Sequence, residues 1–232
     1  MKIGIFDSGM GGTTIMNAIK DLLKNEEYFY IADSKNCPYG EKSDQELMEI
    51  VIKNVETLKN QGVRIIVIAC NTATVKCIKK LREIYRDIKF VGTEPAIKLA
   101  ANTDAKNILV LATPGTVQSE RCEQLLRENQ KEGQEITLLP CPSLADTIEH
   151  TLRFTEDYQP LPLTNQEKNV INDKLQTLLQ DIKQPPDAIV LGCTHYSLIK
   201  PEIQDFFKSA PIKIIDGNSG VAHRVAAIAK SI

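Results

Sequence analysis

A chain of 232 residues, 42% hydrophobic and 25% charged, has enough apolar material for one large domain or two small ones. Its formal net charge of −2 argues against a nucleic-acid surface, which usually carries a basic excess or stripe. No stretch approaches the roughly 20 apolar residues of a membrane helix, and the short N-terminal apolar run meets an acid at Asp7. We therefore expect a cytoplasmic protein whose six cysteines are reduced thiols.

Short β-rich runs alternate with longer amphipathic stretches along the chain. The expected strands are Lys2–Asp7, Tyr28–Asp33, Arg64–Cys70, Lys89–Glu94, Asn107–Thr113, Glu135–Cys141, Ala188–Cys193 and Ile212–Asp216. The expected helices are Gly11–Lys24, Ser43–Asn60, Thr72–Tyr85, Thr116–Asn129, Asn165–Gln180, Ile199–Phe207 and Ser219–Lys230. Most of the strands are nearly continuous apolar runs, which is typical of strands buried on both faces of a parallel sheet. The alternation predicts an α/β architecture with right-handed crossovers.

The two halves of the chain carry similar segments in the same order. Residues 65–72 (IIVIACNT) resemble residues 188–195 (AIVLGCTH): each segment is a buried strand that ends in a small residue, a cysteine and a polar residue. The opening strand and turn, 3–9, are matched in position by 108–115. We therefore expect two similar, pseudo-symmetric α/β domains with largely parallel sheets. Their active site should lie in the cleft between them, at the carboxyl ends of the strands.

Two of the six cysteines stand apart by position. Cys70 and Cys193 each end a buried strand and precede polar residues that begin a turn or helix. Backbone N–H groups and a helix dipole at such a place favour the thiolate. Core packing accounts for the others, which are Cys37, Cys77, Cys122 and Cys141. Because the chain has no Cys-x-x-Cys pair, we expect no structural metal site.

A glycine-rich turn follows the first strand. Residues 7–14 (DSGMGGTT) match neither Gly-x-Gly-x-x-Gly nor a phosphate loop, so they do not indicate a nucleotide. Backbone amides at such a turn can approach an anion, although a tight turn alone would also explain the glycines. Asp7 has three interpretations: a helix cap, a partner for a substrate ammonium, or a group that orients a catalytic thiol.

Other polar residues fall at the same predicted edge. Residues 38–40 (PYG) follow the second strand, where they form a surface turn or cover a small substrate with backbone and side-chain donors. His195 lies two residues after Cys193 and is expected to tune or protonate that thiol. His150 and His223 are interpreted as structural.

Taken together, four motifs resemble the glutamate racemase family, within the wider aspartate/glutamate racemases. They are Gly4–Gly12 (GIFDSGMGG), Pro38–Gly40, Ala69–Ala73 (ACNTA) and Leu191–Tyr196 (LGCTHY), supported by Glu94-Pro95 and Thr116–Ser119 (TVQS). The likeness spans almost the whole chain in the right order. The two cysteine motifs together are its most specific part.

The resemblance implies racemisation of glutamate without a cofactor, supplying D-glutamate for bacterial peptidoglycan. It implies a first domain of residues 1–97 plus about 208–232, a second of about 98–207, a small-molecule substrate, and neither nucleic-acid nor membrane partners. We also expect a homodimer. Carried over by position, Cys70 and Cys193 are the acid/base residues. The substrate contacts are Asp7, Ser8, Tyr39, Gly40, Asn71, Thr72, Thr194 and His195, with Thr116 and Glu149 as neighbours of the site.

The chemistry of these residues supports the same roles. Inversion at an α-carbon is most simply done with one base on each face, so one thiolate removes the proton while the opposite thiol donates another. Two interacting thiols titrate as a pair, with one charged and one neutral in the working state. Asp7 near Cys70 and His195 near Cys193 would give the thiols different environments. Hydroxyl and amide donors would hold the substrate carboxylates.

Three alternatives remain open on sequence alone. The substrate could be aspartate or another amino acid, because side-chain length is not readable here. A cysteine hydrolase or acyl transferase would use Cys193 as nucleophile and His195 as base, leaving Cys70 without a role. A non-catalytic amino-acid-binding protein would not need both cysteines. The chain also departs from the family pattern at Ser197, at Cys122 and in the polar stretch 158–162 (YQPLP).

Overall fold

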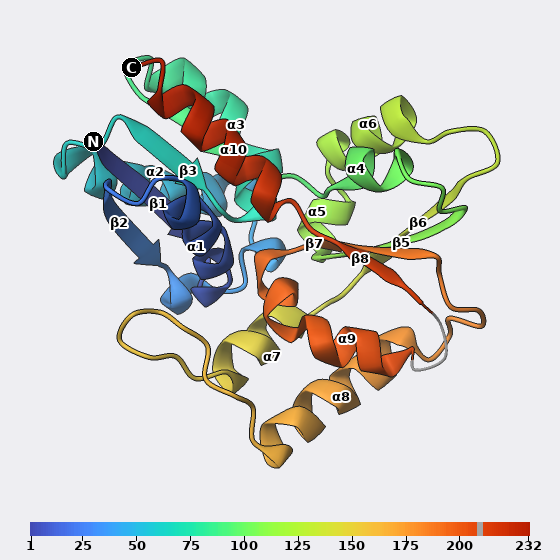
Figure 1. Ribbon diagram of the computed structural model, residues 1–232. Coiled ribbons are helices and arrows are strands. Elements are labelled where there is room, and N and C mark those ends of the chain that lie inside the picture. Colours follow the sequence, from blue (N-terminus) through green and yellow to red (C-terminus); the bar gives the residue numbers. More distant parts are fainter. Residues whose placement is uncertain (208–210) are drawn as a thin grey trace.

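Two four-stranded sheets form the frame of the protein, one in each lobe of the computed structural model, which describes residues 1–207 and 211–232 (Figure 1). In spatial order, the first sheet consists of β2 (Glu27–Ala32), β1 (Lys2–Asp7), β3 (Ile65–Ile68) and β4 (Lys89–Gly92). The second consists of β6 (Glu135–Pro140), β5 (Asn107–Ala112), β7 (Ala188–Gly192) and β8 (Lys213–Ile215). Every strand pair is parallel.

The two sheets have the same strand order, with β5 in the place of β1 and β7 in the place of β3. This confirms the predicted fold class of two similar α/β domains, and it gives the weak internal repeat a structural meaning. Because β3 and β7 are both interior strands, Cys70 and Cys193 follow equivalent strands. By the same symmetry, Thr113 after β5 is the counterpart of the residues after β1.

Helices cover both faces of each sheet, as the continuous apolar strands require. The helices are α1 (Thr13–Leu22), α2 (Asp44–Asn60), α3 (Asn71–Ile84), α4 (Ile97–Ala101), α5 (Pro114–Val117), α6 (Glu120–Asn129), α7 (Leu144–Thr151), α8 (Asn165–Leu179), α9 (Lys200–Phe206) and α10 (Asn218–Ala229). On the first sheet, α1 and α10 pack on one face and α2 and α3 on the other. On the second, α7, α8 and α9 lie opposite α4 and α6.

The helix predictions were wrong in two respects. The expected single helix 116–129 is two, because Ser119 has extended backbone and its hydroxyl accepts a hydrogen bond from the Cys122 N–H at the start of α6. Helices α4 and α7 were not predicted at all. The failure at α7 matters most, since this helix carries Glu149.

The C-terminal segment is shared between the lobes. Strand β8 pairs with β7 in the second sheet, whereas α10 returns to pack against α1 on the first sheet. The expected boundary near residue 208 would assign β8 to the first domain, and residues 208–210 lie outside the described part of the chain. We propose that the first domain consists of residues 1–97 and α10, and that β8 belongs to the second domain.

Within the described ranges, no helix is both long and apolar enough to span a membrane.

Two glycines in open surroundings give a test of the local backbone. A Cβ at Gly220 in α10 or at Gly133 after α6 would have no atom within 4 Å, but only Gly133 has a positive φ, +76°. We expect Gly220→Ala to raise the free energy of unfolding by about 0.5–1 kcal/mol, because alanine loses less backbone entropy in a helix. Gly133→Ala should lower it by about 1 kcal/mol. Urea denaturation measures both, and equal shifts would contradict the assignment.

Candidate active site between the two sheets

A small cavity lies where the carboxyl ends of the two sheets face each other. Its walls are Ser8, Pro38, Tyr39, Gly40, Cys70, Asn71, Thr72, Thr113, Ala145, Gly192 and Cys193, drawn from both lobes. It leaves about 10 Å³ for the centre of a water-sized molecule, roughly the room of one water. The two cysteines singled out by position are the only thiols among the residues that line it.

Each of the two thiols sits at the start of a helical segment. Cys70 is the N-cap residue of α3, and Cys193 is the N-cap residue of the 3₁₀ helix η4 (Thr194–Ile199). Both residues are buried, at 6% and 7% exposure. This placement agrees with the expected position at the mouth of each sheet.

The expected preference for thiolate is not what the closed cavity provides. Burial raises the pKa of Cys70, and the Asp7 carboxylate raises it further, whereas backbone N–H groups of Thr72 and Ala73 and the Ser8 hydroxyl act against this. Burial likewise raises the pKa of Cys193, although His195 opposes it. The helix-terminus effect is present, but the loss of solvation outweighs it. Both thiols are therefore neutral near pH 7 in this closed form.

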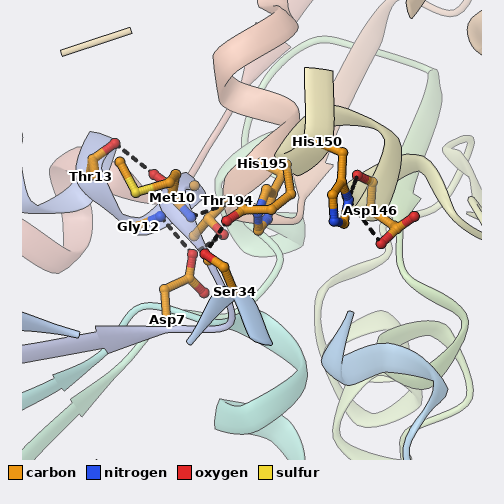
Figure 2. A network of polar contacts seen from close by, with 12 residues as sticks. Asp7, Met10, Gly12, Thr13, Ser34, Asp146, His150, Thr194 and His195 are labelled. Carbon is orange, nitrogen blue, oxygen red and sulfur yellow. Dashed lines mark hydrogen bonds and ion pairs between the residues drawn. The ribbon is translucent and has the colours of Figure 1, made fainter. Parts of the chain in front are cut away.

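Asp7 lies behind the cavity wall rather than in it. Its Oδ2 accepts hydrogen bonds from the Gly12 N–H at 2.6 Å and from the Thr194 hydroxyl at 2.9 Å (Figure 2). Its Oδ1 is buried and has no hydrogen-bond partner within the described residues. Burial raises the pKa of this carboxyl, while His195 and the hydrogen bonds lower it. These contacts join Asp7 to the turn after β1 and to the segment after Cys193, and its role in the site stays a prediction.

Cys193, His195 and Glu149 form a hydrogen-bonded row. The His195 Nδ1 lies 3.8 Å from the Cys193 Sγ, and its Nε2 lies 2.9 Å from the Glu149 Oε2. The imidazole is fully buried, and the Glu149 side chain is 5% exposed. Burial alone would lower the pKa of His195, but the contacts with Cys193 and Glu149 raise it well above its usual value. His195 therefore lies between the Cys193 thiol and the Glu149 carboxylate, and these contacts favour its charged form.

Glu149 also reaches across to the first lobe. Its Oε2 accepts a hydrogen bond from the Met10 N–H at 2.8 Å, and its Oε1 accepts one from the Ser34 hydroxyl. Burial would raise the pKa of Glu149, but the contacts with His195, Ser34 and Met10 lower it. Figure 2 shows Met10, Ser34 and His195 converging from separate segments. One carboxylate of α7 thus binds two segments of the first lobe and the histidine next to Cys193.

The lobes approach so closely that side chains are excluded at some points. A Cβ on Gly11 would lie 2.5 Å from the His195 backbone nitrogen, and a Cβ on Gly115 would lie 2.7 Å from the Gly40 carbonyl oxygen. Both contacts join backbone of one lobe to backbone of the other, so neither neighbour can yield easily. Close approach between the lobes therefore explains Gly11 of the glycine-rich turn, whereas a Cβ on Gly12 would meet Asp7, Ala69 and Tyr30 of its own lobe.

Three threonine hydroxyls form a triangle across the same boundary. Thr72 Oγ1 lies 2.8 Å from Thr113 Oγ1 and 3.1 Å from Thr116 Oγ1, and the last two are 3.0 Å apart. All three residues are buried. Thr72 belongs to the first lobe and the other two to the second, so the triangle joins the lobes beside the cavity.

Two further wall residues differ in what they offer a ligand. The Tyr39 hydroxyl donates to Asp33 at 2.6 Å and accepts from Asn54 at 2.9 Å, so the expected side-chain donor at this position is already engaged. Asn71 is 5% exposed, and its Oδ1 has no hydrogen-bond partner within the described residues. A buried amide oxygen without a partner is costly, so Asn71 is suited to accept a hydrogen bond from a ligand.

The structure separates the predicted site residues into two groups. The cavity wall includes Cys70, Cys193, Ser8, Tyr39, Gly40, Asn71 and Thr72. The remaining ones lie behind it and contact the wall or each other, namely Asp7, Thr194, His195, Thr116 and Glu149. These positions do not test the roles themselves, which stay predictions. Over residues 1–207 and 211–232, no cluster of three His, Cys, Asp or Glu side chains is arranged to hold a metal ion.

Two wall residues were missed as site candidates. Thr113 follows β5 at the position equivalent to the turn after β1, and the internal repeat was a signal that could have found it. Ala145 lies on α7, and an alanine on an unpredicted helix left no signal in the sequence.

Comparison with known proteins agrees with this arrangement. Residues 3–225 match the sequence profile of the Asp/Glu/hydantoin racemases. The chain is 38% identical over 224 residues to glutamate racemase of Clostridium perfringens (strain ATCC 13124), covering 96% of this chain and 81% of that protein. Escherichia coli glutamate racemase, solved with L-glutamate and the activator UDP-MurNAc-Ala, superposes with a TM-score of 0.83 at 30% identity, covering 99% and 82% of the two chains. Bacillus anthracis glutamate racemase RacE1 gives 0.80 at 29% identity, covering 99% and 81%.

The contact between Glu149 and His195 predicts a particular dependence of stability on pH. The pKa of His195 is raised on folding, so its contribution is complete below its unfolded pKa and is lost as the pH rises through the folded pKa. The pKa of Glu149 is lowered, so its contribution is complete above its unfolded pKa and is lost as the pH falls through the folded pKa. The pair is therefore most stabilising at about pH 6, between the ordinary pKa values of the two groups.

We expect Glu149→Gln to lower the free energy of unfolding by about 3 kcal/mol at about pH 6, because it leaves a buried imidazolium without its counter-ion. The loss should shrink as the pH rises through the pKa of His195. Thermal unfolding of both proteins across this range, with the exposed Asp146→Asn as control, measures the difference. A loss that stays the same at every pH would contradict the assignment.

Proposed function

This chain belongs to the Asp/Glu/hydantoin racemase family, and on that premise we propose that it interconverts L- and D-glutamate by a two-thiol acid/base mechanism. The observation that carries the proposal is the pair Cys70 and Cys193, which follow equivalent strands of two similar sheets and line one cavity between them. An arrangement of this kind provides one acid/base group for each face of an α-carbon held between the lobes.

Substrate binding follows from the hydrogen-bonding capacity of the cavity wall. The Asn71 Oδ1 accepts a hydrogen bond from the substrate ammonium group, which satisfies this buried oxygen. The hydroxyls of Ser8, Thr72 and Thr113 donate to the carboxylates. Charge-assisted hydrogen bonds to the α-carboxylate also stabilise the negative charge that spreads onto it when the α-proton leaves.

Thiolate formation is coupled to substrate binding in this proposal. Both thiols are neutral in the closed cavity because burial raises their pKa values. The substrate ammonium brings a positive charge next to them, which lowers the pKa of a neighbouring thiol. One thiol gives its proton to solvent before the lobes close, and the charged form of His195, whose Nδ1 lies next to the Cys193 Sγ, stabilises a thiolate there. On the other side, the backbone N–H groups at the start of α3 stabilise the thiolate of Cys70.

The proton transfers then differ only in direction. The thiolate on one face removes the α-proton, and the thiol on the other face donates a proton to the resulting carbanion. The product has the opposite configuration and the two thiols have exchanged their protonation states. The reverse reaction starts from that state, so the proposed mechanism needs no cofactor.

Movement of the lobes is part of the mechanism. The cavity has room for about one water, and glutamate is several times larger. Entry therefore requires the contacts between the lobes to break, including Thr194 to Asp7 and Met10 to Glu149. Closure then excludes water from the reacting α-carbon.

One observation favours a second candidate function. The row Cys193, His195 and Glu149 has the order of nucleophile, base and orienting acid used by cysteine hydrolases and acyl transferases. That function leaves Cys70 in the opposite wall without a role, so we favour racemisation. Aspartate or another amino acid remains the alternative substrate within the same chemistry.

The cellular side of the proposal follows from the reaction. D-glutamate is a component of bacterial peptidoglycan, so the enzyme would serve cell-wall synthesis. Both working thiols must stay reduced, and we therefore place the reaction in the cytoplasm. The proposal also includes a homodimer as the working assembly.

Serine substitutions of the two cysteines provide the test. In D₂O with L- or D-glutamate, the unchanged protein should racemise either enantiomer and incorporate deuterium at the α-carbon. Cys70→Ser and Cys193→Ser should each lower kcat by at least about 10²-fold, because each removes the acid/base group of one face. Each variant should still exchange the α-proton of one enantiomer without inverting it, and the two variants should act on opposite enantiomers.

The control is Cys122→Ala, which changes a buried thiol away from the cavity and should leave kcat unchanged. Full activity in both serine variants would refute the two-thiol mechanism. Loss in Cys193→Ser alone, together with hydrolysis of a glutamyl ester, would favour the hydrolase. Turnover of aspartate alone would change the substrate.

A further inference from the structure

A hairpin of the second lobe contacts the first lobe outside the cavity. Residues 153–161 form it through a bridge between Phe154 and Pro160 and hydrogen bonds between Thr155 and Gln159. Its turn places Tyr158 at φ 61°, a conformation uncommon for residues other than glycine. In Figure 1 this loop extends from α7 toward β2 and α1. The hairpin includes the start of the polar stretch to which the proposed function gives no role.

The contact across the lobes is aromatic and polar. The Tyr158 ring packs edge-on against the Tyr30 ring of β2, with centroids 5.6 Å apart and an interplanar angle of 60°. Beside it, the side-chain amides of Gln159 and Asn17 lie 3.4 Å apart. Because an edge-on aromatic pair has a preferred geometry, this contact fixes the position of the hairpin relative to Tyr30.

Tyr30 in turn holds the turn that follows β1. Its hydroxyl donates a hydrogen bond to the Gly9 carbonyl at 2.6 Å. The same hydroxyl would lie 2.9 Å from a Cβ on Gly12, so it is in close contact with the turn at both ends. Between these glycines, the Met10 N–H binds Glu149, and the Gly12 N–H binds Asp7.

We propose that Tyr30 is a positioning residue for racemisation, and that Tyr158 couples this role to closure of the lobes. Tyr30 fixes the orientation of the turn, the turn presents its N–H groups to Glu149 and Asp7, and Glu149 orients His195 at Cys193. Tyr158 packs on Tyr30 only when the second lobe is in place. The inference rests on the proposed function, because it assigns a role within that reaction.

Tyr28 offers a matched control for Tyr30. It lies two residues earlier on the same strand and the same face, and its hydroxyl also donates to a carbonyl at 2.6 Å, that of Leu23. Tyr28→Phe and Tyr30→Phe therefore remove equivalent hydrogen bonds, and only the second is connected to the site.

We expect Tyr30→Phe to lower kcat by about three- to tenfold, the weight of one neutral hydrogen bond, with a smaller change in KM. Tyr28→Phe should lower the thermal stability by a similar amount and leave kcat unchanged. Since enantiomers are equally stable, kcat/KM must fall by the same factor in both directions, which checks the measurement internally. Equal kcat values in the two variants would overturn the proposal.

The coupling through Tyr158 is tested by a double-mutant cycle. Tyr158→Ala should lower kcat/KM, and the loss in Tyr30→Phe/Tyr158→Ala should be smaller than the product of the two single losses, because both act through one turn. For Gln159→Ala, on the same hairpin, the loss of kcat/KM in the double variant with Tyr30→Phe should equal the product of the two single losses. If the loss of kcat/KM in Tyr30→Phe/Tyr158→Ala equalled the product of the two single losses, the coupling would be overturned.

A measurement without substrate separates this inference from the proposed function. NMR titration of His195 in the free protein should give a lower pKa in Tyr30→Phe than in Tyr28→Phe, because a loosened turn holds Glu149 less firmly. Absence of glutamate racemisation in the unchanged protein would refute the proposed function while this titration still reports on Tyr30. Identical His195 titrations in the two variants would refute the positioning role.

Discussion

The Glu149 carboxylate is the contact on which the rest of the site depends. It lies on a helix of the second lobe, yet it binds a backbone amide and a hydroxyl of the first lobe as well as His195. A buried anion needs such partners, and here they come from three separate segments. The same carboxylate therefore joins the two lobes, favours the charged form of His195 and determines which way the imidazole faces Cys193. If the lobes moved apart, Glu149 would lose its contacts with Met10 and Ser34 and keep the one with His195, which lies in its own lobe.

The two halves share a topology and differ in chemistry. The strand orders are identical, so symmetry alone delivers a thiol to each side of the cavity. The supporting groups are unlike: a buried carboxylate lies near Cys70, and a charged imidazole contacts Cys193. A protein made of L-residues cannot provide mirror-image walls for mirror-image substrates. The two equivalent thiols therefore have different neighbours. Because the enantiomers are equally stable, only the kcat/KM values of the two directions must be equal.

Much of this arrangement could be predicted from sequence, because strands buried on both faces and strand-end cysteines leave a strong local pattern. Every expected strand is present, and Cys70 and Cys193 meet at one cavity. The features that the sequence did not predict depend on contacts between segments far apart in the chain. Helix α7 has few residues and lacks a side-chain cap, so nothing local marked it. Tyr30 reads as an ordinary strand aromatic, since its partners Gly9 and Tyr158 are brought to it only by the fold.

The threonine triangle has a consequence for the proposed binding of a carboxylate. Three hydroxyls carry three protons, and in a closed ring each proton is already given to the next oxygen. The three hydrogen bonds can run in either direction around the ring, so the structure does not fix one arrangement of the protons. A carboxylate arriving beside Thr72 and Thr113 must turn at least one hydroxyl out of the ring, exchanging a neutral hydrogen bond for a stronger charged one. Because the ring joins both lobes, a bound carboxylate would replace some of the hydrogen bonds that its entry breaks. The negative charge of the ligand would then hold the two lobes together at this point.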